Sequence, residues 1–333
     1  MIAAGAFARH LAPGDLLAVY GVGSVAAALA GGEIVRRILV EGAEDAATLS
    51  LARLFAPTLL AAVAGAAVLA AWLFRGEPAL ALDAACVLLA STVFGVLVTA
   101  FGASVLPFGE GFFTAANRVR ERREHLLRTP TAIVEPRWAL SITGIAIVMA
   151  VLGWFGVAPF LAHGAWIAKP AFWGASTLGV FLFAFAAGRD WREALAATAA
   201  LAAFVLLILW LWSQALGRIS PAAFVEIVTA SSAAYMPMLA LMSARRRFLA
   251  AGDESGVARL RALEELGASP YFAAAVSVVV LLPWIVLHGS AAVLAAMFAL
   301  AGVAAIVVQP AIATALEGFI PRRRSLNQLY GRG

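Results

Sequence analysis

Long stretches without any charged residue constrain this chain more than any other feature of its sequence. The run from Ala194 to Gly217 reads ALAATAALAAFVLLILWLWSQALG, and Ala84–Gly109, Trp138–Ala162 and Pro270–Leu287 also lack charged residues. A helix of about 20 apolar residues spans the roughly 30 Å hydrocarbon core of a bilayer. The sequence therefore predicts an all-α fold, a polytopic transmembrane helical bundle.

Nine segments have the length and hydropathy expected of membrane spans. They lie at about 14–31, 54–74, 82–107, 138–157, 171–187, 194–215, 222–243, 270–287 and 291–312. The composition agrees, because only 13% of the residues are charged, whereas a soluble domain carries about 25%. The single cysteine, Cys86, excludes a disulfide framework and a multi-cysteine metal site. The start of the chain lacks the pattern of a cleavable signal peptide, so the first span is expected to act as the insertion signal.

The basic residues indicate the orientation of these spans. Of the 24 lysines and arginines, all but four fall in one alternating set of loops. The four in the other set are Arg9, Arg75, Lys169 and Arg218. Because loops rich in Lys and Arg stay on the cytoplasmic side, the N-terminus is expected outside and the C-terminus in the cytoplasm.

Two parts of the chain resemble each other and indicate an internal repeat. The segment Glu33–Pro57 matches Ala244–Pro270, with Gly42 aligned to Gly252, and a Glu-Gly-Phe triplet follows each copy after two further spans. Spans 1–3 and 7–9 are therefore predicted to be a parallel three-helix repeat, a recurring architecture among transporters.

The expected organisation has three parts. The first is a membrane bundle of three helices over residues 1–109, and the second is a cytoplasmic basic amphipathic linker over residues 110–137. The third is a membrane bundle of six helices over residues 138–333.

The order of features after Gly188 is typical of one family of membrane proteins. A short basic turn, GRDWRE, is followed by an apolar helix and then by a helix that ends in ARRR and a glycine; an amphipathic helix and a second glycine follow. This order resembles the membrane domain of the RND superfamily, particularly its MMPL-type lipid exporters. The resemblance implies that spans 1–3 are the family's helices four to six and spans 4–9 its helices seven to twelve. It also implies that the last helix ends near Pro310.

Two departures from the RND pattern bear on function. The family's first three helices and its large periplasmic domains have no counterpart here, so the resemblance is to a truncated membrane domain. The family's proton-carrying aspartate falls near Tyr235, Met236 and Pro237, where this chain has no carboxylate. Because an ion-coupled pump needs an ionisable group within the membrane, the resemblance supports the fold more than a proton-driven mechanism.

Polar residues near the start of the seventh span form the candidate transport or proton site. Glu226 is the carboxylate placed deepest within a predicted span, and Thr229, Ser232 and Tyr235 follow near one helical face. Asp83, at the start of the third span, could neutralise a helix N-terminus or lie beside Glu226. The alternative is an interfacial Glu226 with hydroxyl groups that hydrogen-bond to their own helix.

Two clusters of arginines are candidate contacts with lipid headgroups or with a partner protein. One lies in the segment EGFFTAANRVRERREHLLR, which is either an amphipathic helix in the headgroup layer or an ordinary basic linker. The other ends the seventh span. The candidate residues are Arg118, Arg120, Arg122, Arg123, Arg245, Arg246 and Arg247.

No HExxH, GxSxG, Walker A or GxGxxG arrangement occurs, so no enzyme activity, no metal site and no cofactor are expected. The sequence instead predicts a transport protein of the bacterial inner membrane, resembling an RND/MMPL-type exporter of lipids or other hydrophobic molecules. The expected partners are membrane lipids and a protein: an RND-like subunit, a periplasmic carrier or an ATPase. Nucleic acid is not expected, because the net charge of +5 comes from the cytoplasmic loops.

Two other functions remain open at this stage. The segment Leu263–Pro270 also resembles the coupling helix of ABC-type permeases, including those that traffic lipids, which would require a separate ATPase. A membrane scaffold without transport activity is the second alternative.

Overall fold

The computed structural model describes the chain as a bundle of helices. It covers Leu11 and residues 13–41, 45–73, 78–105, 135–161, 170–216, 221–266, 269–285 and 289–319. Each of the nine predicted spans coincides with a helix, and the described residues contain no strand. The predicted helical membrane bundle is therefore confirmed.

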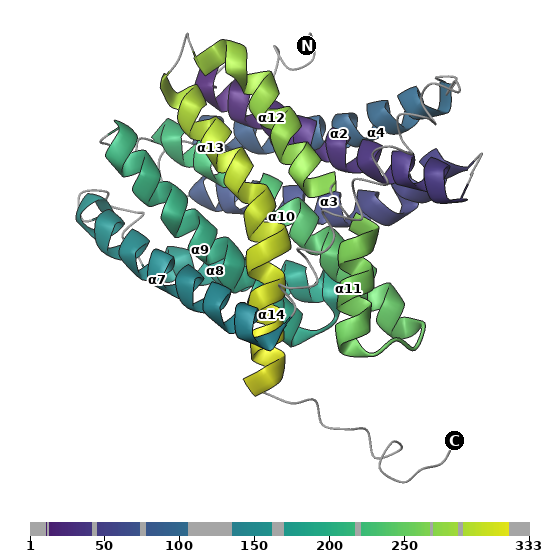
Figure 1. Ribbon diagram of the computed structural model, residues 1–333. Helices are drawn as coiled ribbons and strands as arrows, with labels where there is room; N and C mark the ends of the chain where they lie inside the picture. Colours follow the sequence, from purple (N-terminus) through teal and green to yellow (C-terminus); the bar gives the residue numbers. More distant parts are fainter. Residues whose placement is uncertain are drawn as a thin grey trace.

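The helices are labelled as in Figure 1. They are α2 (Pro13–Glu41), α3 (Ala46–Leu73), α4 (Pro78–Val105), α7 (Pro136–Leu161), α8 (Pro170–Gly188), α9 (Trp191–Leu216), α10 (Pro221–Ala250), α11 (Ser255–Leu266), α12 (Ser269–Ile285), α13 (Gly289–Val303), the π-helical turn η1 (Ala304–Val308) and α14 (Gln309–Phe319).

Seven spans in the described part of the chain are long and apolar enough to cross a membrane, counting α13, η1 and α14 as one. Helix α8 is apolar but shorter, and α12 qualifies together with α11, from which it is bent by 44°. Large apolar side chains such as Phe94 and Phe101 on α4 and Ile145 and Phe155 on α7 lie exposed on the outside of the bundle. Lipid is the environment that suits such a surface, and the chain is a multi-pass membrane protein.

Proline marks the start of many of the helices. Pro13, Pro78, Pro136, Pro170 and Pro221 are the first residues of α2, α4, α7, α8 and α10. The first helical position suits proline, because the N–H group it lacks would have no partner within the helix there. These joints lie within a few residues of the positions that the sequence predicted.

Two prolines inside helices bear on the sequence interpretation. Pro57, which the predicted span 54–74 includes, lies inside α3, surrounded by good helix formers such as Leu54 and Ala56. The last helix was expected to end near Pro310, but it continues to Phe319. There the backbone widens into the π turn η1, where the N–H of Gln309 bonds to the carbonyl of Ala304 five residues earlier. Because Pro310 has no N–H group to donate, it cannot take part in the α-helical hydrogen-bond pattern, and this explains the local change to π-helical hydrogen bonds.

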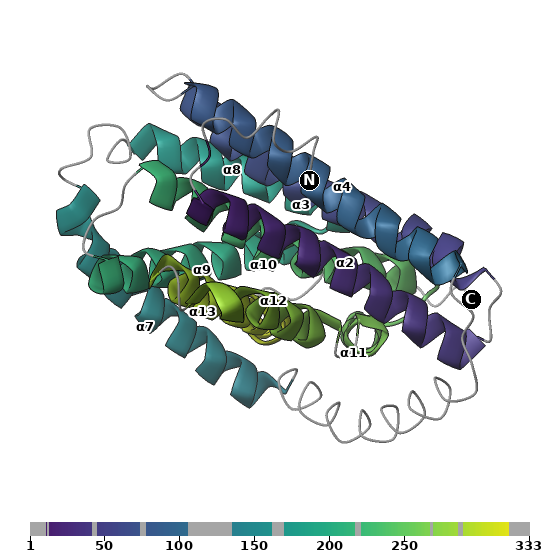
Figure 2. The same cartoon turned by 90° about the horizontal axis from the view of Figure 1, so that it is seen from above.

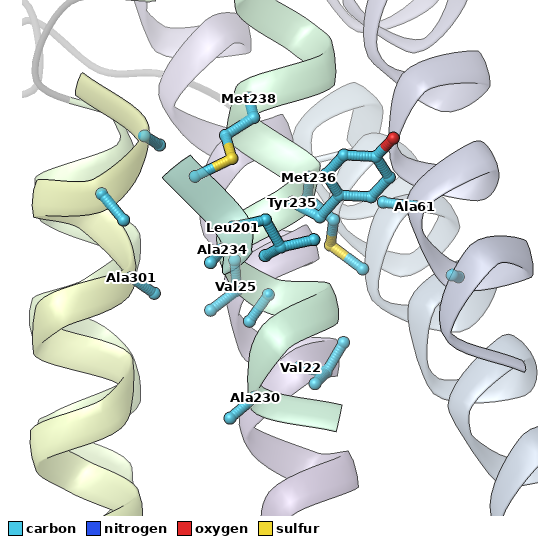
Figure 3. Packing of buried hydrophobic residues seen from close by; sticks show 14 of the residues in the cluster. Val22, Val25, Ala61, Leu201, Ala230, Ala234, Tyr235, Met236, Met238 and Ala301 are labelled. Carbon is cyan, nitrogen blue, oxygen red and sulfur yellow. The ribbon is translucent and has the colours of Figure 1, made fainter. Parts of the chain in front are cut away.

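Helix α10 lies at the centre of the bundle. It packs against α2, α3, α8, α9 and α13. Figure 2 shows α4 and α7 at opposite sides of the molecule, with α2, α9 and α10 between them. Figure 3 shows the packing around α10, where Val22 and Val25 of α2, Leu201 of α9 and Ala301 of α13 surround Tyr235 and its neighbours.

Much of the helix packing repeats as the sequence repeat predicts. If α2, α3 and α4 correspond to α10, α12 and α13–α14, the packing of α2 on α4 has a counterpart in α10 on α13, whereas α2 packs on α3 without comparable packing of α10 on α12. Helix α3 packs on α4, and α12 packs on α13. Between the units, α10 packs on α3 and α2 packs on α12, while α2 and α10 pack on each other. This arrangement is that of two parallel units around an axis between α2 and α10.

The glycine that the two repeat copies share ends α10. Gly252 has a φ of +98°, a backbone conformation that favours glycine. Its N–H donates to the carbonyl of Leu249 at 3.1 Å, and the N–H of Asp253 donates to the carbonyl of Phe248 at 3.1 Å. This pair of bonds is a Schellman motif, which stops the helix and turns the chain into α11. The aligned Gly42 lies outside the described residues.

Candidate functional site

The central helix α10 is buried on all sides and yet carries polar residues. All residues from 223 to 245 except Ser243 are buried. The polar ones in the half of the helix near its start are Glu226, Thr229, Ser231, Ser232 and Tyr235. Polar groups inside a membrane bundle are costly and mark candidate paths for ions or substrates.

Glu226 interacts electrostatically with a second buried carboxylate, which the sequence interpretation missed. Its side chain is only 5% exposed, and its Oε2 atom has no hydrogen-bond partner among the described residues. The neighbouring acid is Asp15 of α2, which is fully buried and close enough to interact electrostatically with Glu226. One signal could have found Asp15: at the shift that aligns the two repeat copies, it matches Val225, the residue before Glu226.

The hydroxyl groups that follow Glu226 are bound to their own helix. Thr229 donates to the carbonyls of Val225 and Glu226. Ser231 and Ser232 each donate to the carbonyl four residues earlier, at 2.7 and 3.0 Å. These are the backbone bonds that the sequence left open as the alternative, and they satisfy the hydroxyl protons without involving the Glu226 carboxylate.

Tyr235 occupies the position where the RND resemblance expects an aspartate. It is 1% exposed, and its hydroxyl donates to the carbonyl of Val180 on α8 at 2.5 Å. One turn further along α10, Gln309 donates to the carbonyl of Met238 at 3.5 Å. In the middle of the bundle, a hydrogen bond between uncharged groups therefore connects α10 to α8, at the position where the resemblance expects an ionisable carboxylate.

Asp83 lies apart from this central region. It is half-buried in the second turn of α4, a helix that packs chiefly on α2 and α3 at the edge of the bundle (Figure 2). The carboxylate that the structure brings to Glu226 is thus Asp15.

The opposite end of the bundle, called here the arginine-rich end, holds a buried cluster of charges. It gathers the ends of α2, α10 and α14 and the starts of α3 and α9, with α11 beside them. The cluster consists of Asp190, Glu193, Arg245, Ser255, Arg259, Thr314 and Glu317.

Arg245 is one of two arginines at the centre of this cluster. It is 2% exposed. Its Nη1 atom lies 3.2 Å from Glu193 Oε1 and 3.3 Å from Asp190 Oδ2, and its Nη2 atom lies 2.8 Å from Glu317 Oε1. Its Nη2 also donates to the hydroxyl of Ser255 at 2.6 Å. The sequence interpretation made this arginine a candidate contact with lipid headgroups or a partner protein; in the structure its guanidinium pairs with carboxylates inside the protein.

Arg259 of α11 is the other central arginine. Its Nη2 atom lies 2.6 Å from Glu193 Oε1 and 3.0 Å from Glu317 Oε1, and its Nη1 donates to Thr314 at 2.9 Å. Burial by itself lowers the pKa of this guanidinium, but the Glu193 and Glu317 carboxylates outweigh burial and raise its pKa overall. Arg259 is therefore permanently charged, and it fixes α11 against α9 and α14.

The turn between α8 and α9 positions the carboxylates of the cluster. Arg189 has a φ of 52°, an uncommon conformation for a residue with a side chain. It is followed by Asp190, whose Oδ1 accepts the N–H of Arg192 at 3.1 Å and so caps the start of α9. Glu193, in the first turn of α9, is thereby directed toward Arg245 and Arg259. This turn is the basic turn on which the RND resemblance rests.

The other candidate arginines divide into two groups. Arg247 pairs with Glu265 of α11 at 2.6 Å, and the same carboxylate lies 3.0 Å from Arg53 of α3. Arg246 is half-buried. Contacts of Arg246 and Arg247 with lipid or a partner stay predictions. The four candidates from the basic linker, Arg118, Arg120, Arg122 and Arg123, lie outside the described residues.

The described residues include no group of three or more His, Cys, Asp or Glu side chains that could hold a metal ion. What the arrangement offers chemically is a pair of buried carboxylates at one end of α2 and α10 and a compensated ion cluster at the other.

Comparisons with known proteins bear on the fold. No known family profile and no curated protein matches the sequence. A solved structure does match: the crystal structure of SecDF in its super-membrane-facing form, with a TM-score of 0.58 and 12% sequence identity. The match covers 92% of this chain and 54% of the SecDF chain, so this chain spans about half the length of SecDF. At 12% identity this match shows the fold alone: the helices of the chain are arranged as in part of SecDF.

Proposed function

We propose that this chain is a membrane transport protein in which α2 and α10 form the functional core. The observation that carries the proposal is Glu226, a carboxylate buried in the central helix whose Oε2 has no hydrogen-bond partner among the described residues. Such a group is expensive in a membrane protein and is usually kept for ion or substrate movement. The RND-like arrangement of helices agrees with this role.

The substrate class is proposed to be lipids or other hydrophobic molecules, as in the MMPL-type exporters that the sequence resembles. The membrane is proposed to be the bacterial inner membrane, with the arginine-rich end in the cytoplasm. This orientation follows from the distribution of the basic residues. The chain is proposed to work within a larger complex, together with an RND-like subunit or a periplasmic carrier.

The position of α11 favours this proposal over an ABC-type permease. A coupling helix must offer its surface to an ATPase, whereas half of α11 is buried against the chain itself. Arg259 and Glu265 tie this helix to α9, α14, α10 and α3 through ion pairs. Helix α11 is therefore held within the bundle.

The proposal is tested by reconstituting the protein, with whatever co-purifies in mild detergent, into vesicles that contain a fluorescent phospholipid. A pH gradient is imposed, and movement of the phospholipid between leaflets is followed by quenching with dithionite. We expect faster movement with the gradient than without it. The substitution Glu226→Gln should remove this dependence, because it keeps the shape of the side chain and removes the charge.

The matched control is Glu254→Gln, which makes the same chemical change at an exposed position between α10 and α11. This variant should behave like the native protein. If the phospholipid moves no faster than in protein-free vesicles, both with and without the pH gradient, the proposal for lipids is overturned. Movement that requires a co-purified ATPase and its ATP would favour the permease.

A further inference from the structure

Two arginines from different helices share one carboxylate at the arginine-rich end of the bundle. We propose that Arg53 of α3 and Arg247 of α10 form a binding site for a phosphate group, and that this phosphate belongs to the headgroup of an anionic lipid. The site goes beyond the transport function proposed above, because it requires no movement of lipid and involves neither Glu226 nor the buried ion cluster.

The first support is the geometry of the two side chains. Arg53 Nη1 lies 3.0 Å and Arg247 Nη2 lies 2.6 Å from the same atom, Oε1 of Glu265. Since both guanidinium groups are within hydrogen-bond distance of one oxygen, they lie next to each other. Glu265 of α11 is only 8% exposed, so a buried acid holds the two arginines together.

The second support is the balance of charge within this group. Two guanidinium groups meet one carboxylate, so positive charge is in excess among the three side chains. Like charges held side by side repel each other, and an anion placed against both arginines would relieve this repulsion. The buried cluster differs, because Arg245 and Arg259 already pair there with carboxylates from α9 and α14.

The third support is that both arginines are open on one side. Each of the two side chains is 37% exposed. A guanidinium group carries five N–H donors, and each of these two directs one donor to Glu265. The planar fork of donors suits phosphate oxygens, which can accept two parallel bonds from one arginine. The exposed donors therefore suit an anion that approaches from outside the bundle.

The depth of the site favours a lipid headgroup as the source of the phosphate. Arg53 directly precedes the predicted span 54–74, and Arg247 shortly follows the predicted span 222–243. Both arginines thus lie where an apolar span gives way to charged residues, which is the level of the headgroups. Basic residues at this level attract anionic lipids.

The site also joins the two repeat units. Arg53 belongs to the first unit and Arg247 to the second, and α3 and α10 pack on each other. A headgroup bound by both arginines would therefore bridge the units on the surface, beside the bridge that Glu265 makes within the protein. The sequence made Arg247 a candidate for a lipid contact, whereas Arg53 joins it through the fold.

The site is tested by native mass spectrometry of the purified full-length protein, titrated in detergent with phosphatidylglycerol. Phosphatidylcholine with the same acyl chains is the comparison, because it has the same phosphodiester but no net charge. We expect the native protein to bind the first phosphatidylglycerol molecule more tightly than the first phosphatidylcholine. Arg53→Gln and Arg247→Gln should each weaken the binding of phosphatidylglycerol about fivefold and leave that of phosphatidylcholine unchanged.

The matched control is Arg261→Gln, which makes the same change at an arginine of α11 that is 54% exposed and pairs with Asp253. This variant should bind phosphatidylglycerol like the native protein. An equal loss in Arg261→Gln would indicate a general effect of net charge and would overturn the site. Unchanged binding in both Arg53→Gln and Arg247→Gln would also overturn it. Each of these two variants leaves one arginine on Glu265, so either variant decides the matter if the other does not fold.

Inorganic phosphate separates a lipid headgroup from a soluble phosphate compound. We expect an excess of inorganic phosphate to leave the melting temperature of the native protein unchanged, while phosphatidylglycerol raises it. If phosphate raises the melting temperature of the native protein but not of Arg247→Gln, and phosphatidylglycerol is not preferred, the assignment to a lipid is refuted. Arginine-dependent binding of phosphatidylglycerol without any gradient-driven lipid movement would keep this site and refute the transport function.

Discussion

At the scale of single residues, charges are buried at both ends of the bundle under opposite conditions. Arg245 and Arg259 are each within reach of at least two carboxylates, so their charges are compensated. Glu226, at the other end of α10, is buried, and its Oε2 has no hydrogen-bond partner among the described residues. A compensated cluster holds helices in place, whereas a buried carboxylate oxygen without a partner is costly.

The ion cluster predicts a large loss of stability for Glu193→Gln. This change removes the carboxylate that accepts from Arg259 at 2.6 Å and lies 3.2 Å from Arg245. Removing one member of a buried ion pair leaves an uncompensated charge, so the free energy of unfolding should fall by about 3 kcal/mol. Denaturant titration in detergent, followed by tryptophan fluorescence, measures this change.

The control is Asp253→Asn, which removes a pair at the protein surface. Asp253 lies 2.8 Å from Arg261, whose side chain is 54% exposed. Because water screens such a pair, the loss should be about 0–1 kcal/mol. Equal losses in the two variants would contradict a role for burial in the strength of the cluster.

The sequence revealed part of the candidate site, for identifiable reasons. Glu226 stands out because it interrupts an apolar run, but Asp15 follows Pro13 in a first turn, where an acid is expected to favour a helix dipole. The sequence also cannot tell which arginine of a consecutive triplet points inward. Packing of α9 and α14 makes that choice, and it selects Arg245.

At the scale of elements, small residues determine how closely the helices approach. A Cβ atom added to Gly95 of α4 would lie 2.5 Å from the carbonyl oxygen of Gly23 in α2. Such a distance is too short for any side chain, and backbone cannot move aside as a flexible side chain could. The crossing of α2 and α4 therefore depends on glycine, as is common among membrane helices.

We accordingly expect Gly95→Ala to separate α2 from α4 and to reduce the free energy of unfolding by about 1–3 kcal/mol. Thermal unfolding in detergent provides the measurement.

Gly102→Ala is the control on the same helix. No atom lies within 4 Å of a Cβ atom added at Gly102, so the substitution creates no clash. Alanine is the better helix former by about 1 kcal/mol, and this variant should be as stable as the native protein or more so. A loss similar to that of Gly95→Ala would show that the loss does not arise from the crossing of α2 and α4.

The sequence predicted the ends of the helices better than their interiors. Prolines at first helical positions are reliable, because only the local geometry matters there. Pro57 and Pro310 lie inside helices, where tertiary packing decides whether the chain breaks, bends or widens. The bend between α11 and α12 appears in one repeat unit, while the equivalent part of α3 is continuous.

At the scale of the whole molecule, the two repeat units have different surroundings. Helices α8 and α9 pack on α10, and α7 and α9 pack on α14, so the second unit is enclosed. On α2, the equivalent of α10, Leu16 is 39% exposed and Tyr20 is 60% exposed. Helix α2 therefore presents one face outward in the described structure, whereas its equivalent α10 is enclosed.

The distribution of arginines predicts how the bundle is oriented in the membrane. Because α2 and α10 both run from the end that holds Asp15 and Glu226 to the arginine-rich end, an arginine-rich end in the cytoplasm places Asp15 and Glu226 near the outer surface. Reporter fusions at Arg128 and Arg324 should then report the cytoplasm, and a fusion at His163 the outside; all three positions lie outside the described residues. An outward report from Arg128 or Arg324, or a cytoplasmic report from His163, would contradict this topology. With the predicted orientation, Asp15 and Glu226 lie toward the outside and the ion cluster lies toward the cytoplasm.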